Sequence, residues 1–96
     1  MSEQPETIQQ VLGKVRSWAR QTILFAIRVR DDVEFRSQSE EFQAKRALEQ
    51  MDRVEPELFT QAHQDAGGNL MRMGLVFPEL VLKWVHKELS PTFHPE

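Results

Sequence analysis

The chain contains no cysteine, and this absence excludes several classes of function at once. Disulfide bonds, cysteine-based zinc sites and thiol catalysis all require a residue that the sequence lacks. Because a cysteine-free chain fits a reducing compartment, we expect a cytoplasmic protein. The first six residues, Met-Ser-Glu-Gln-Pro-Glu, are polar and acidic, whereas a secretion signal begins with a basic and then an apolar run.

Long hydrophobic runs are also missing. The longest apolar stretches, residues 23–27 and 74–77, are far shorter than the roughly 20 residues that a membrane-spanning helix needs. The sequence therefore predicts a soluble protein without a membrane span. Two Trp, six Phe and a 40% hydrophobic share argue against disorder, and 96 residues suit a single domain. We expect flexible tails at residues 1–5 and 91–96.

Acidic residues are absent from residues 7–30, although this stretch holds five cations. Residues 31–96 hold seven cations and thirteen acids, so the net charge of −3 is unevenly distributed. Such a basic segment can form a surface for nucleic acid or an anionic membrane. The interpretation we favour is that acidic neighbours within the fold, or across a dimer, neutralise it.

The same stretch carries apolar residues at alternating spacings of four and three, the pattern of a helix that packs against other helices. These positions are Ile8, Leu12, Val15, Ala19, Thr22, Ala26, Val29 and Val33. A second column of Val11, Trp18 and Phe25 lies beside them and widens the apolar stripe. The pattern predicts a long first helix from about residue 6 to residue 35, with Leu24 and Ile27 on its polar side.

An alternative interpretation places a short β-hairpin within residues 23–36. Residues 27–30 and 33–36 alternate apolar and charged side chains as two strands would. The intervening turn, however, has no Gly or Asn, and an isolated hairpin is only marginally stable. We therefore favour an all-α fold over an α+β fold with a hairpin at 23–36.

Three shorter segments are expected to follow the first helix, which makes a bundle of about four helical segments. Ser37 or Ser39 is a candidate N-cap for the second segment, and Pro56 lies in the first turn of the third. Two consecutive glycines at 67–68 would cost about 2 kcal/mol inside a helix, so they should end the third segment.

The fourth segment should begin after Asn69 as its cap and be interrupted at Pro78, because proline removes a helical hydrogen bond. We expect it to end at Ser90 and Pro91. Its apolar residues cover most of the circumference, which predicts that it is the most buried segment.

No residue pattern indicates catalysis or cofactor binding. The histidines, His63, His86 and His94, lie on different segments without a second ligand at metal-binding spacing. No glycine-rich phosphate loop is present, and no nucleophile has an evident base. We therefore expect no catalytic activity, no cofactor and no metal site.

The remaining class is a helical module for protein–protein interaction, acting as an adaptor, regulator or assembly factor. A first helix about twice as long as the others would leave an apolar patch uncovered, and such patches bind partners. The predicted interface residues are Trp18, Leu24, Phe25, Ile27, Phe35 and Phe42. We expect the partner to be a second copy of the chain, which would give a homodimer; the alternative is a different protein. The alternative is a nucleic-acid-associated regulator that uses the basic face of the first helix, namely Lys14, Arg16, Arg20 and Arg28.

Overall fold

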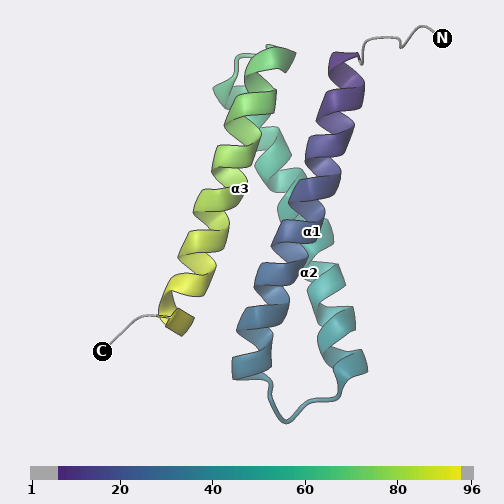
Figure 1. The fold of residues 1–96 in the computed structure, drawn as a ribbon, viewed down its shortest axis with the longest axis vertical. Coiled ribbons are helices and arrows are strands. Elements are labelled where there is room, and N and C mark those ends of the chain that lie inside the picture. Colours follow the sequence, from purple (N-terminus) through teal and green to yellow (C-terminus); the bar gives the residue numbers. More distant parts are fainter. Residues whose placement is uncertain (1–6, 94–96) are drawn as a thin grey trace, which may run out of the picture.

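The computed structural model describes residues 7–93, and these residues form three helices connected by short turns (Figure 1). The helices are α1 (Ile8–Glu34), α2 (Glu40–Asp65) and α3 (Leu70–Phe93). All regular secondary structure in the described range is helical, which confirms the all-α class. The alternative hairpin at 23–36 is wrong because α1 continues without interruption to Glu34, where both predicted strands would lie.

Local capping explains where the helices begin and end. The Thr7 side chain accepts a hydrogen bond from the Gln10 backbone N–H at 3.1 Å, and Gln10 Oε1 accepts from the Thr7 backbone N–H at 2.9 Å. The Ser39 hydroxyl caps α2 by accepting from the Phe42 N–H at 3.1 Å. The predicted start of the first helix at residues 5–6 lies outside the described residues. The predicted break at residues 67–68 is confirmed, since Gly67 and Gly68 have φ of +61° and +80°.

The prediction of four segments is wrong, and so is the expectation that the first helix is about twice as long as the others. Pro56 lies inside α2 and Pro78 inside α3, and α3 continues past the expected end at Ser90 to residue 93. The helices have 27, 26 and 24 residues, so their lengths are nearly equal. Packing explains the continuity of α3, because Phe77 and Val81 on either side of Pro78 are both fully buried in one core. Their burial outweighs the single hydrogen bond that proline removes.

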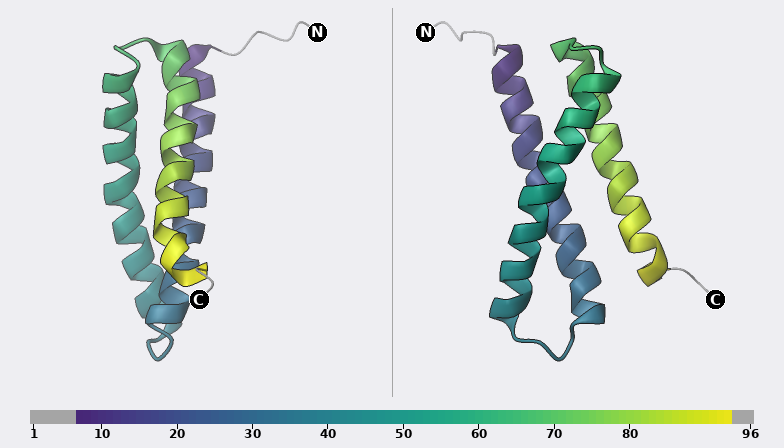
Figure 2. Two further views of the ribbon diagram at one scale, coloured as in Figure 1. Left: turned by 90° about the vertical axis from the view of Figure 1, so that its left-hand side faces the viewer. Right: turned by 180° about the vertical axis from the view of Figure 1, so that it is seen from behind.

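The three helices form two layers. α1 and α3 run in the same direction and form one layer, and α2 runs in the opposite direction behind both of them (Figures 1 and 2). α2 crosses behind α1, so α2 and α3 diverge toward the carboxyl-terminal end of α3 (Figure 1). One face of the α1–α3 layer is therefore covered by α2, and the other face has no helix of the described chain against it.

Apolar residues from all three helices form the core between the layers. Its main cluster consists of Ala19, Ile23, Ile27, Ala47, Met51, Val54, Ala62, Phe77 and Val81. Phe59 and Phe77 pack edge to face with ring centroids 5.3 Å apart. Ile27 is fully buried, so its predicted place on a polar side is wrong: α1 contacts two helices and buries a wider arc than a single seam. α3 is also not the most buried helix, because Met71 and Leu75 are more than 70% exposed.

Candidate interaction surface

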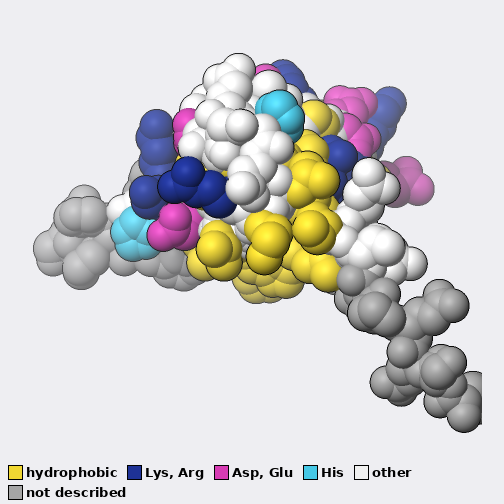
Figure 3. Space-filling view, turned by 90° about the horizontal axis from the view of Figure 1, so that it is seen from above, with side chains coloured by type: hydrophobic (Ala, Val, Ile, Leu, Met, Phe, Trp, Pro, Cys, Tyr) yellow, Lys and Arg dark blue, Asp and Glu magenta, His cyan; other side chains and the backbone are white. Residues whose placement is uncertain are grey.

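An exposed apolar surface covers the side of α1 and α3 that faces away from α2. Viewed from above, hydrophobic side chains gather along this edge of the molecule (Figure 3). We call it the α1–α3 face and define it by the exposed residues Ile8, Val11, Trp18, Phe25, Met71, Leu75 and Leu82. Exposed fractions range from 40% for Trp18 to 75% for Leu75.

Helix geometry explains why these residues share one face. Val11, Trp18 and Phe25 are spaced by seven residues, close to two helical turns, so they form a row along α1. Leu75 and Leu82 have the same spacing and form a second row along α3. α1 and α3 run in the same direction within one layer (Figure 1), and Val11 of the first row and Leu75 of the second line one groove between them.

A groove lies between the two helices near their amino-terminal ends. Ile8, Val11 and Leu12 line one side, and Leu70, Met71, Gly74 and Leu75 line the other. The groove has a volume of about 300 Å³. A Cβ atom built on Gly74 would meet no atom within 4 Å, so the missing side chain at this position adds open space to the groove.

Charged residues lie at the rim of the face. At about 100° per residue, Lys14 and Asp32 lie about 40° around α1 from Trp18. By the same measure Glu79 and His86 lie about 40–60° around α3 from Leu82. The α1 edge of the face therefore carries a cation and an acid, and the α3 edge carries an acid and a histidine, with apolar residues between the two edges.

The structure separates the predicted interface residues. Trp18 lies on the α1–α3 face. Phe25 lies at its outer edge, where it also lines a hollow with Gln43 of α2. Leu24 is half-buried against the core. Ile27 belongs to the core itself, so a charged residue at this position would unfold the monomer instead of dissociating an assembly. Phe35 and Phe42 pair across the α1–α2 turn, with ring centroids 6.3 Å apart. Exposed Met71, Leu75 and Leu82 were missed because the apolar circumference of α3 was interpreted as burial.

The basic residues of α1 contact acidic residues of α2. Arg16 donates two hydrogen bonds to Glu55, at 2.6 and 2.8 Å, and its guanidinium lies 4.1 Å from the centre of the Phe59 ring. The hydrogen bond to Glu55 raises the pKa of Arg16, with coulombic attraction adding to the shift and burial opposing it. The expectation that acidic neighbours neutralise the basic segment is confirmed for Arg16.

The other cations extend this pattern. Arg20 contacts Asp52 at 2.7 Å, and Arg28 lies 3.8 Å from Glu40. Lys14, the fourth residue of the predicted nucleic-acid surface, lies on the rim of the α1–α3 face instead. These ion pairs orient most of the basic face toward α2, where it contributes to helix packing.

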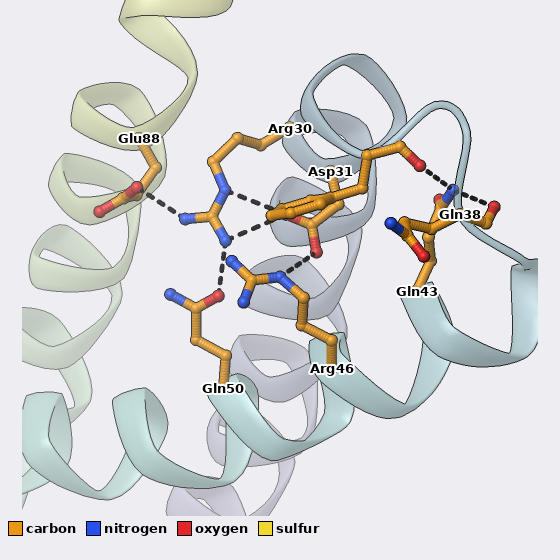
Figure 4. Close-up of polar contacts among 8 residues, drawn as sticks. Arg30, Asp31, Gln38, Gln43, Arg46, Gln50 and Glu88 are labelled. Carbon is orange, nitrogen blue, oxygen red and sulfur yellow. Dashed lines mark hydrogen bonds and ion pairs between the residues drawn. The ribbon is translucent and has the colours of Figure 1, made fainter.

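A second polar network joins all three helices near the carboxyl-terminal end of α1 (Figure 4). Arg30 contacts Asp31 on α1, Gln50 on α2 and Glu88 on α3, the last at 2.9 Å. Arg46 donates to Asp31 at 3.2 Å, so this fully buried carboxylate has two cationic partners. Among the described residues, every buried side-chain nitrogen or oxygen atom has a hydrogen-bond partner. The network holds the diverging end of α3 to the other helices.

Within the described residues, histidine and carboxylate side chains form no group of three that could hold a metal ion. None of the three helices, over the same range, has a stretch long and apolar enough to cross a membrane. Comparison of the chain with protein-family models, curated proteins and solved structures found no significant match.

Proposed function

We propose that the protein is a helical protein–protein interaction module whose contact surface is the α1–α3 face. It acts as an adaptor, regulator or assembly factor, without a catalytic step or a cofactor. The absence of cysteine supports a cytoplasmic location as part of the same proposal.

The size of the exposed apolar surface carries this proposal. The exposed fractions of its seven side chains together equal about four fully exposed large apolar residues. A fully exposed large apolar side chain has an accessible surface of about 200 Å², so the exposed apolar surface of the face is roughly 800 Å². The largest apolar patch on a typical monomer is about 300–600 Å². The face also carries two aromatic residues, Trp18 and Phe25, about two helical turns apart on α1. An apolar face of this size with aromatic residues is typical of a surface that binds a partner.

Site-specific photo-crosslinking tests the proposal. Benzoylphenylalanine in place of Leu75 should form covalent protein adducts in the cells that produce the protein. The matched control carries the same group in place of Leu48, which is 47% exposed but lies on α2. We expect at least about fivefold more adduct from position 75. Equal or undetectable adduct formation at the two positions would refute the function of this face.

The nucleic-acid alternative is a second candidate because Lys14 and Arg28 remain near the surface. The ion pairs of Arg16 and Arg20 with α2 give these cations a structural role, which favours the interaction module. A salt titration distinguishes the two functions. Binding to phosphates weakens steeply between about 0.05 and 0.5 M salt, whereas an apolar interface does not.

A further inference from the structure

We infer that the occupant of the α1–α3 face is a second copy of this chain, in a two-fold symmetric dimer. The inference rests on the proposed function and identifies the partner. In this dimer the two α1–α3 layers stack face to face, and α2 of each copy lies on the outside.

The residues outside the described range are poor candidates for covering the face. Residues 1–6 and 94–96 contain two prolines and three glutamates, with Met1 as the one large apolar residue among them. Polar segments of this composition cannot replace water over a surface of roughly 800 Å². Neither segment is therefore suited to cover the face.

The area of the face fits a dimer. A stable interface of standard size buries about 800 Å² on each partner, which matches the exposed apolar area of the seven face residues. A single partner helix lying between α1 and α3 would cover the groove but leave the outer parts of both rows exposed. A second α1–α3 layer has the width to cover both.

The geometry of the face is compatible with two-fold symmetry. Both rows repeat every seven residues, so the side chains of one copy can enter the gaps between those of the other. The charged side chains lie at the rim, where they keep their hydration when the apolar centre is covered. Asp32 and Glu79 also disfavour an anionic membrane as the occupant, because a membrane surface selects a uniformly basic rim.

The first test is absolute mass by light scattering after gel filtration, from about 1 to 500 μM protein and at two salt concentrations. We expect twice the chain mass of 11.3 kDa, with a dissociation constant that changes less than about threefold with salt. A monomer at all concentrations would overturn the inference. In that case, adducts at position 75 with the mass of another protein would leave the proposed function intact.

Matched variants then locate the interface. Leu75→Glu and Phe25→Glu should each weaken the dimer by at least about 100-fold, because an unpaired carboxylate would be buried. Leu48→Glu should leave the dissociation constant within about threefold of the parent value. Circular dichroism should show equal helix content in all three, since each side chain is at least 47% exposed in the monomer. A dimer that survives both face substitutions would overturn the inference as well.

Discussion

Replacement of Arg16 by methionine should destabilise the protein far more than the loss of one ion pair at the surface. The Glu55 side chain is fully buried, and Arg16 supplies both of its charged hydrogen bonds. Arg16→Met keeps an apolar stem near the Phe59 ring but leaves the carboxylate without a cation. An uncompensated buried charge of this kind costs about 3–5 kcal/mol.

This loss is large relative to the whole stability of the domain. A chain of this size has a free energy of unfolding of roughly 5–14 kcal/mol, at about 0.05–0.15 kcal/mol per residue. Since 1 kcal/mol corresponds to about 4–8 °C in melting temperature for such a domain, we expect a decrease of at least about 12 °C. Thermal unfolding followed by circular dichroism, with urea unfolding as a second measure, gives both quantities.

A neighbouring ion pair provides the control. Arg20 and Asp52 are 43% and 61% exposed, so Arg20→Met should cost less than about 1 kcal/mol. The double variant Arg16→Met/Glu55→Met should regain most of the lost stability, because no buried charge then remains without a partner. The reasoning is refuted if Arg16→Met and Arg20→Met have the same effect, or if the double variant is less stable than Arg16→Met.

Further predictions concern the core and the helix ends. Phe77→Ala should lower the free energy of unfolding by about 3–5 kcal/mol in urea titrations, because a fully buried ring leaves a cavity. Gly13→Ala should raise it by about 0.5–1 kcal/mol, since the new methyl group meets no atom within 4 Å. Gly68→Ala should lower it by about 1–2 kcal/mol because φ is +80° there, and equal effects of the two glycine substitutions would contradict the backbone argument. Ser39→Ala should cost about 1 kcal/mol through loss of the α2 cap, as measured by the melting temperature.

The proposed dimer gives the two aromatic residues of the α1–α3 face a common role. Trp18 and Phe25 are each about two helical turns from the next residue of their row, and both are substantially exposed in the monomer. In a stacked pair of layers they would lie within the contact, where aromatic side chains contribute strongly to binding. In a Trp84→Phe variant, where Trp18 is the one remaining indole, the fluorescence should then shift to shorter wavelength as the protein concentration rises, because the indole leaves water. An emission spectrum independent of concentration across the dimerisation range would argue against this placement.

The distribution of charge illustrates how sequence and structure divide the explanation. The acid-free stretch at residues 7–30 was sufficient to predict acidic partners elsewhere in the chain. The choice of Glu55 and Asp52 was not predictable, because it depends on how α2 lies against α1. The same orientation decided that Trp18 faces solvent while Ile27, nine residues later, lies in the core.

By itself the sequence determined the helical class, the caps at Ser39 and Asn69 and the break at Gly67–Gly68. These features depend on interactions between residues about four positions apart or fewer, so local patterns reveal them. Only the tertiary structure decided that the helices continue through Pro56 and Pro78 and that rows on α1 and α3 combine into one apolar face. These outcomes depend on packing between residues some thirty to sixty positions apart, whose burial outweighs local preference.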